Sequence, residues 1–162
     1  AAEAPYDGLM ALEGKLTLSL LEQIVTLAEF AKADLRVAPA SPGKAERLKP
    51  FFNHINTTLY VNLEEAELLC GHRFATAAAG ADALLQSGAT RALVTDGANS
   101  AAFASATERF DITPPQVTVQ RITGAGDTFM AAHIAAEIAG QTPDAALKLA
   151  VDTAARYVAG DT

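Results

Sequence analysis

The chain has 162 residues, of which 50% are hydrophobic and 19% are charged, enough to bury one sizeable core. Its formal net charge of −7 and its pI of about 4.8 argue against a nucleic-acid groove or a basic membrane-binding patch, because both need clustered Lys and Arg. A single cysteine, Cys70, excludes an internal disulfide and fits a reducing cytoplasm, where we expect the protein to work. The three histidines lack the spacing of zinc ligands, and no apolar run is long enough to cross a membrane.

Apolar residues recur along the chain with periods that predict helices and strands in alternation. Helices are expected over residues 17–33, 44–55 (with a break near Pro50), 63–70, 77–86, 127–139 and 143–158. Strands are expected over residues 35–38, 58–61, 91–95, 101–104 and 109–112, the last two as a hairpin. Gly71 is expected to end the helix before it, and Thr142 to cap the last helix with Pro143 at its first position.

Strands that alternate with helices, and that are apolar enough to lie inside, indicate layers of helix around a mainly parallel sheet. The expected fold class is therefore α/β. No Gly/Ser linker, low-complexity tract or repeat divides the chain, so residues 1–162 are expected to form a single segment. In such sheets ligands bind where strands end and helices begin. Three groups of residues suited to ligand binding lie at points of this kind.

The most informative group is the stretch Thr-Gly-Ala-Gly-Asp-Thr-Phe at residues 123–129, which precedes an Ala-rich helical run. Glycines at the mouth of a helix let the backbone approach a ligand and aim its first N–H groups at an anion. The carboxylate of Asp127 follows those donors, where it is placed to accept a proton from a hydroxyl group. An anion site beside a base is what phosphoryl transfer to an alcohol requires. Taken alone, the stretch is more typical of a tight turn with Asp at a helix N-terminus, because short glycine motifs are frequent by chance.

The other two groups follow expected strands. Asn62 ends a strand and Glu65 lies in the first turn of the next helix, so their amide and carboxylate suit a hydrated magnesium ion, held directly or through water. The alternative is an Asn N-cap with Glu three residues later, an arrangement like a capping box. Thr95 and Gly97 offer a hydroxyl group and a backbone amide to a nucleotide phosphate, and the alternative there is an ordinary β-turn.

Together the three groups resemble motifs of the ribokinase-like (PfkB) carbohydrate and nucleoside kinases. Residues 62–67 (Asn-Leu-Glu-Glu-Ala-Glu) are similar to the family's N-x-x-E segment, and residues 94–99 (Val-Thr-Asp-Gly-Ala-Asn) to its nucleotide loop. Residues 122–129 resemble its C-terminal signature, which is the most specific of the three. The resemblance runs over essentially the whole chain and corresponds to the C-terminal half of a family member. Segments most similar to the pseudouridine kinase subfamily lie at residues 37–41, 44–50 and 54–57.

The resemblance implies a ribokinase-like (Rossmann-like) fold with α/β/α layers and a mainly parallel sheet, and ATP and Mg²⁺ as cofactors. It implies that Asp127 is the catalytic base on the acceptor hydroxyl. The implied anion hole for the phosphoryl group consists of Gly124, Ala125 and Gly126. The remaining implied roles are magnesium and phosphate binding by Asn62 and Glu65, nucleotide binding by Thr95, Gly97 and Thr123, and contact with the adenine by Ala150, Thr153, Ala154 and Tyr157.

Several positions depart from the family's pattern. Arg121 stands where the family usually has Asp or Asn, a position that commonly helps to hold a monovalent cation, so this cation site is expected to be lost or replaced by Arg121 itself. The family's N-terminal half, with its glycine pair for the sugar and its β-lid, has no counterpart in these residues. Weak catalysis is therefore expected from this segment alone, and any homodimer is expected to form through parts not present here. The other departures are Ala38 for Asp, Tyr60 and Val61 for Lys-Pro, and Ser100 for Gly.

The leading hypothesis is a cytoplasmic, ATP- and magnesium-dependent kinase that phosphorylates a primary hydroxyl of a sugar or nucleoside, with pseudouridine as the first candidate. The expected partner is a small molecule, with neither nucleic acid nor membrane. The alternative is a nucleotide- or metabolite-binding module that has lost catalysis, which Arg121, Ala38 and the missing half favour. A dinucleotide-dependent oxidoreductase is disfavoured, because no G-x-G-x-x-G follows the first strand.

Overall fold

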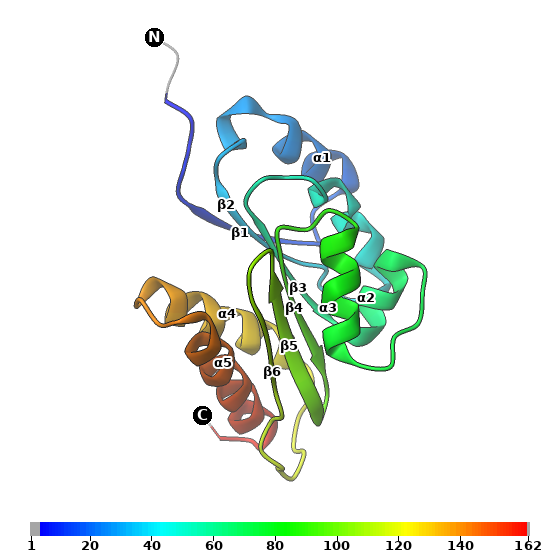
Figure 1. Cartoon of the computed structure of the whole chain (residues 1–162), viewed down its shortest axis with the longest axis vertical. Helices are drawn as coiled ribbons and strands as arrows, with labels where there is room; N and C mark the ends of the chain where they lie inside the picture. Colours follow the sequence, from blue (N-terminus) through cyan, green and yellow to red (C-terminus); the bar gives the residue numbers. More distant parts are fainter. Residues whose placement is uncertain (1–3, 162) are drawn as a thin grey trace.

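The computed structural model describes residues 4–161, which form a six-stranded sheet with helices on both faces (Figure 1). The strands lie in the sheet in chain order, and each pairs with the next. They are β1 (Leu9–Glu13), β2 (Asp34–Ala38), β3 (Thr57–Asn62), β4 (Arg91–Asp96), β5 (Asn99–Ser105) and β6 (Arg109–Ile112). The α-helices are α1 (Leu18–Thr26), α2 (Leu63–Cys70), α3 (Ala77–Gln86), α4 (Ala125–Ile138) and α5 (Pro143–Val158), and the 3₁₀ helices are η1 (Ala28–Phe30) and η2 (Pro42–Phe51).

The sheet is mainly parallel. Strands β1 to β4 run in one direction, β5 is antiparallel to β4, and β6 is antiparallel to β5. The carboxyl ends of the four parallel strands therefore share one edge of the sheet. Strand β3 is buried over its first five residues, as expected for an interior strand that is covered on both faces.

Helices α1, α2 and α3 cover one face of the sheet, and α4 and α5 cover the other (Figure 1). Because successive side chains of a strand point to opposite faces, Leu59 and Val61 join the core beneath α2 and α3, whereas Tyr60 joins the core beneath α4 and α5. The second core also holds Phe103 and Phe129. These three layers confirm the expected α/β/α fold.

Local signals fix most helix ends where the sequence predicts them. Helix α2 ends before Gly71, which adopts a left-handed conformation (φ 64°) that glycine reaches without strain. Helix α3 spans the expected residues, and the hydroxyl of Thr76 caps it by accepting a hydrogen bond from the Ala79 N–H at 3.2 Å. Thr142 precedes α5 as expected, but its hydroxyl donates to the Asp144 carboxylate at 2.6 Å instead of capping the helix backbone.

The expected helix over residues 17–33 is wrong in its second half. Helix α1 stops at Thr26, whose hydroxyl bonds the carbonyls of Glu22 and Gln23, and the backbone is extended at Leu27 (φ −67°, ψ 125°) before η1 begins. Residues 44–55 are likewise not α-helical. They belong to η2 and the turn after it, and Pro50 supplies no N–H to continue an α-helix.

Two further segments differ from what their sequences suggest. The sequence pattern does not predict β1, because this edge strand is only partly buried and lacks a run of buried apolar residues. Residues 117–122 have the composition of a strand, yet they form none, and α4 begins at Ala125 rather than at Asp127. The N–H groups of Gln120 and Arg121 bond the carbonyl of Val158 instead of a neighbouring strand.

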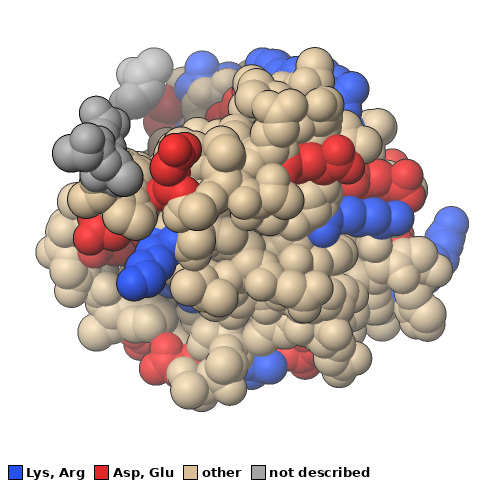
Figure 2. All heavy atoms as spheres, turned by 90° about the horizontal axis from the view of Figure 1, so that it is seen from above, with Lys and Arg blue, Asp and Glu red and all other residues tan. Residues whose placement is uncertain are grey.

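On the face that Figure 2 shows, Lys and Arg side chains are scattered among Asp and Glu side chains. Within residues 4–161, no helix has both the length and the apolar character needed to span a membrane.

Candidate functional site at the carboxyl edge of the sheet

The register of the sheet brings two of the candidate binding residues together. Asn62, the last residue of β3, pairs with Thr95 of β4, so both lie at the carboxyl edge of neighbouring parallel strands. This is the edge at which α/β sheets bind ligands. The spacing along the chain does not reveal this neighbourhood, which arises from the parallel pairing of β3 and β4.

Asn62 and Glu65 form the capping box that the sequence left as one alternative. The Asn62 side-chain oxygen accepts from the Glu65 N–H, and a Glu65 carboxylate oxygen accepts from the Asn62 N–H, each at 2.8 Å. Glu65 is only 7% exposed, and burial raises the pKa of its carboxyl group against the lowering effect of the Asn62 hydrogen bond. The arrangement does not suit direct chelation of a metal by both side chains, because it already uses the Asn62 oxygen and one Glu65 oxygen.

Gly97 lies in the tight turn between β4 and β5. Its φ of 56° is left-handed, and an added Cβ would meet nothing within 4 Å, so its backbone faces open space. The side-chain amide of Asn99 donates to the Asp96 carboxylate at 3.1 Å and supports the turn. The backbone of this segment therefore forms the β-turn that is the alternative to a phosphate-binding loop. Gly97 is nevertheless exposed beside Thr95.

The first turn of α4 carries the glycine motif. Gly124 is its N-cap, with a left-handed backbone (φ 91°). The Ala125 N–H bonds the Ile122 carbonyl at 3.0 Å, and the Thr128 N–H and hydroxyl both bond the Gly124 carbonyl. No acceptor in residues 4–161 takes the N–H groups of Gly126 and Asp127, and both residues are exposed. Two free donors and a solvent-facing carboxylate thus meet at a helix N-terminus, which favours an anion.

The end of α5 packs beside this turn. The Tyr157 hydroxyl donates to the Thr123 carbonyl at 2.6 Å. Arg121 stacks its guanidinium on the Tyr157 ring, 3.8 Å from the ring centre, and donates to the Tyr157 carbonyl at 2.7 Å. A hollow of about 490 Å³ opens here, lined by Arg121, Thr128, Thr153, Arg156, Tyr157 and Asp161.

The four residues of α5 assigned to the adenine do not share one environment. Thr153 and Tyr157 line the hollow. Ala150 is fully buried in the core beneath α4 and α5, and Ala154 packs against that core. The candidate binding residues thus fall into two groups, one with Asn62 and Thr95 and the other with Thr123, Gly124 and Tyr157. In the described part of the chain, no hydrogen bond or ion pair joins the two groups.

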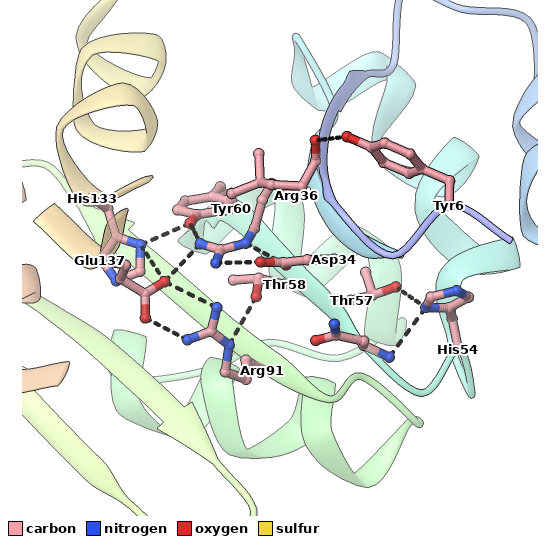
Figure 3. A network of polar contacts seen from close by, with 12 residues as sticks. Tyr6, Asp34, Arg36, His54, Thr57, Thr58, Tyr60, Arg91, His133 and Glu137 are labelled. Atoms are coloured by element: carbon pink, nitrogen blue, oxygen red, sulfur yellow. Dashed lines mark hydrogen bonds and ion pairs between the residues drawn. The ribbon is translucent and has the colours of Figure 1, made fainter. Parts of the chain in front are cut away.

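A polar network that the motifs do not point to lies under α4 (Figure 3). Arg36 of β2 holds Asp34 with two hydrogen bonds and donates to Tyr60 and Glu137, and Arg91 of β4 makes two hydrogen bonds to Glu137. The carboxylate of Glu137 is thus shared by two guanidinium groups. The signal in the sequence is an arginine in each of two mainly apolar strands, Arg36 within β2 and Arg91 at the start of β4, because a buried arginine needs an acidic partner.

Burial and charge shift the titration of this network. Burial alone would raise the pKa of Glu137, but the hydrogen bonds and charge of Arg91, together with His133 and Arg36, lower it to about 2. Burial raises the pKa of Tyr60 to about 12. Burial lowers the pKa of His133 to about 4, with Arg91 and Arg36 adding to the effect and Glu137 opposing it. The network is therefore two cations balanced by two anions, with a neutral phenol and imidazole.

The three layers and the polar carboxyl edge define an α/β protein of the kind that binds small ligands at the ends of parallel strands. Comparison with family models then places the chain further. A model described as "pfkB family carbohydrate kinase" matches residues 6–159, and the chain belongs to this family. No match was found among curated proteins.

Solved structures agree with this assignment. A carbohydrate kinase from Agrobacterium tumefaciens is 27% identical, with a TM-score of 0.76 over 91% of this chain and 46% of its own. A putative sugar kinase from Clostridium perfringens is 20% identical, with a TM-score of 0.82 over 93% of this chain and 48% of its own. A putative ribokinase II from E. coli, solved with ATP and Mg²⁺, is 22% identical, with a TM-score of 0.73 over 93% of this chain and 52% of its own. The chain thus spans about half the length of the structures it matches.

Proposed function

We propose that this chain is the nucleotide-binding and catalytic half, corresponding to the C-terminal half, of an ATP-dependent kinase that phosphorylates a primary hydroxyl of a sugar or nucleoside. The observation that carries the proposal is the first turn of α4. There the N–H groups of Gly126 and Asp127 are free, and the Asp127 carboxylate is open to solvent beside them. Membership of the PfkB carbohydrate kinases supports the reaction class.

In the proposed reaction, the acceptor hydroxyl gives its proton to the carboxylate of Asp127. The hydroxyl oxygen then attacks the γ-phosphorus of ATP, and the bond between that phosphorus and the leaving ADP oxygen breaks. In the turn that begins at Gly124, the free N–H groups of Gly126 and Asp127 are proposed to donate to the phosphoryl oxygens, where the negative charge of the transition state lies, whereas the Ala125 N–H is already bonded to the Ile122 carbonyl. These donors are fixed before the substrate arrives, so no reorganisation is needed during the transfer.

The nucleotide is proposed to lie across the carboxyl edge of the sheet. Thr95 and Gly97 supply a hydroxyl and an uncovered backbone to its phosphates, and Thr123 and the hollow lined by Thr153 and Tyr157 lie beside α5 for the rest of the nucleotide. Ala150 is fully buried, so it would support that surface from the core behind it.

Magnesium neutralises the phosphates of ATP when it is bound. The residues of this chain fit a contact through water rather than direct chelation. Asn62 and the Oε2 oxygen of Glu65 are held in the capping box, which leaves the Oε1 oxygen of Glu65 to accept from a water of the hydrated ion. The buried position of Glu65 fixes where that oxygen points.

The proposed acceptor is pseudouridine. The similarity of residues 37–41, 44–50 and 54–57 to the pseudouridine kinase subfamily supports this choice. These segments lie between the end of β2 and the start of β3 and overlap both strands, and the first of them includes Ala40, whose backbone is left-handed (φ 71°). The proposed class of reaction does not depend on which acceptor is bound.

A second candidate is a nucleotide-binding module without catalysis. It is favoured by Arg121, whose guanidinium donates to the carbonyls of Tyr157 and Asp161 and so places a fixed positive charge beside the glycine turn. This candidate keeps the anion site of α4 and dispenses with the acceptor.

Calorimetry with ATP and Mg²⁺, followed by product analysis with pseudouridine and a panel of sugars, distinguishes the candidates. The complete protein that carries this chain is expected to bind ATP and to form a phosphorylated product, and Asp127→Asn is expected to retain binding and lose the product. Binding without product from any acceptor would favour the module. Absence of ATP binding would contradict both candidates.

A further inference from the structure

The candidate binding residues are carried by elements that meet outside the site. Asn62 and Thr95 end strands β3 and β4, and Asp127 lies in the first turn of α4. Within residues 4–161, no hydrogen bond or ion pair joins Asp127 to either strand. The polar network under α4 joins the same helix to the same strands at another level (Figure 3). The position of Asp127 relative to Asn62 and Thr95 therefore depends on contacts made away from the site.

Glu137 is the centre of this network. It lies one residue before the end of α4, and it accepts two hydrogen bonds from Arg91, at 2.7 and 3.0 Å, and one from Arg36, at 2.6 Å. Arg91 is the first residue of β4, and its Nε donates to the Thr58 hydroxyl of β3 at 2.9 Å. One carboxylate thus connects the last turn of α4 to three neighbouring strands, β2, β3 and β4.

A second contact shows in which direction α4 runs over the sheet. His133 lies one turn before Glu137, and its Nδ1 is 2.7 Å from the Tyr60 hydroxyl. Tyr60 pairs with Leu93, so it lies nearer the carboxyl edge of the sheet than Arg91 does. Earlier residues of the helix thus contact later residues of the strands, and α4 runs antiparallel to β3 and β4.

This direction brings the start of α4 towards the edge that carries the candidate site. The helix rises about 15 Å between Glu137 and Asp127. Strand β4 covers about 13 Å between Arg91 and Thr95. The helix and the strand are therefore similar in length between the network and the site, so a shift or tilt of α4 at Glu137 also displaces Asp127.

Apolar packing alone fixes the place of α4 only loosely. The buried residues of α4 are Phe129, His133 and Ala136, so Phe129 is the one large apolar side chain that this helix buries. Small side chains form shallow ridges, which let a helix slide or turn with little loss of packing. The ion pairs are more demanding, because two guanidinium groups fit one carboxylate in a defined geometry and a misplaced partner leaves a buried charge unpaired. The side chains of Arg36 and Glu137 are only 6% and 17% exposed.

We propose that Glu137 is a positioning residue that holds α4 at one place on the sheet and thereby sets the distance of Asp127 from Asn62 and Thr95. This inference rests on the proposed function, because it takes Asp127 to be the base and the ends of β3 and β4 to bind the nucleotide. The two arginines that pair with Glu137 act with it, and none of the three touches the substrate.

The direct test is the orientation of α4 in the ligand-free complete protein, measured by NMR through backbone N–H residual dipolar couplings. Glu137→Gln keeps the size of the side chain but loses its charge and one acceptor oxygen, so its contacts with the arginines weaken. The couplings of α4 are expected to depart from the frame that fits β3 and β4 in the unaltered protein. Couplings of α4 that still fit that frame would overturn the inference.

Two further variants make the result specific. Leu84→Ala is the control, because Leu84 is fully buried in the core on the other face of the sheet. It removes core packing without touching the network, so the couplings of α4 should stay unchanged, and an equal change there would contradict the inference. Arg91→Lys keeps the charge but loses the two-bond contact with Glu137, so it should reorient α4 as Glu137→Gln does. If Glu137→Gln does not fold, unchanged couplings of α4 in Arg91→Lys would overturn the inference instead.

Kinetic measurements separate positioning from stability. At a temperature where Glu137→Gln is folded, it should lower kcat by about 10- to 100-fold, because a base displaced by about 1 Å loses the reacting geometry. KM for ATP should change by less than about threefold, since the residues proposed to bind the nucleotide are unaltered. Leu84→Ala should retain kcat within about twofold. Full kcat in Glu137→Gln would show that the network only stabilises the fold.

The two readouts also separate this inference from the function on which it rests. If the unaltered complete protein forms no product with any acceptor, the proposed function fails, and the couplings still decide whether Glu137 sets the orientation of α4. If product is formed, but Glu137→Gln keeps both the orientation of α4 and its kcat, the positioning role fails and the proposed function stands.

Discussion

The hydroxyl of Tyr60 lies 2.7 Å from Nδ1 of His133, in a buried contact between β3 and α4. The Arg36 guanidinium can only donate, so at 3.0 Å it gives a hydrogen bond to the Tyr60 oxygen. The Nε2 atom of His133 is buried and has no partner in residues 4–161. Strand β3 is thus linked to α4 through an imidazole that must remain neutral.

The first prediction is that the protein loses stability as the pH falls from about 6.5 to about 4. The pKa of His133 is about 4 in the folded chain and near 6.5 when unfolded, so in that window the unfolded chain binds the proton more readily. The folded state should therefore lose about 2 kcal/mol between pH 7 and pH 5, measured by urea unfolding.

His133→Gln supplies the comparison for this prediction. It removes the titrating group while keeping a polar side chain under α4, so the loss of stability between pH 7 and pH 5 should become smaller than in the unaltered protein. The carboxylate of Glu137 titrates in a lower pH range, so its contribution to stability is lost as the pH falls from about 4.5 towards about 2. An identical slope between pH 7 and pH 5 in both proteins would show that His133 is not responsible.

The second prediction concerns the ion pairs of the same network. Glu137→Ala leaves two largely buried guanidinium groups without their shared carboxylate, and it should lower the free energy of unfolding by about 3–5 kcal/mol. Asp152→Ala is the control, because its partner Lys148 is 65% exposed and such pairs contribute less than about 1 kcal/mol. Thermal unfolding of both variants would test the difference, and a similar loss in the two would contradict it.

The contrast between the two halves of the molecule shows what the sequence makes predictable. Helix α2, with Asn62 before it and Gly71 after it, is specified by residues that act within a few positions, and so the sequence predicts its bounds. The network of Arg36, Arg91 and Glu137 joins residues up to 101 positions apart, and no local pattern indicates that they meet. The same limit applies to the neighbourhood of Asn62 and Thr95, which follows from strand register.

The start of α4 illustrates a subtler limit. The glycine motif predicts a turn and a helix, and both are present. The loop before α4 is also tied to α5, because the Tyr157 hydroxyl donates to the Thr123 carbonyl. A contact between residues 34 positions apart leaves no periodic signal in the sequence, so the motif does not predict it.

The third prediction tests the base. Asp127→Asn should lower kcat of the complete kinase by about 10²–10⁴-fold, because an amide cannot accept the proton of the acceptor hydroxyl. Since Asp127 is exposed, the substitution should change the free energy of unfolding of the protein by less than about 0.5 kcal/mol. Asp111→Asn, on the exposed side of β6, is the matched control and should retain full turnover. Ordinary turnover by Asp127→Asn would remove the base from the mechanism.

The last prediction concerns monovalent cations. The Arg121 guanidinium donates to the carbonyls of Tyr157 and Asp161, so a fixed positive charge already lies against the end of α5 beside the glycine turn. A bound potassium ion would have to displace that charge or sit beside it, and both are unfavourable. Turnover should therefore differ by less than about twofold between potassium chloride and tetramethylammonium chloride at equal ionic strength. Arg121→Asp should make turnover rise with potassium, because carboxylate and carbonyl oxygens are then left to accept the ion. A strong dependence on potassium in the unaltered protein would show that Arg121 does not replace the cation.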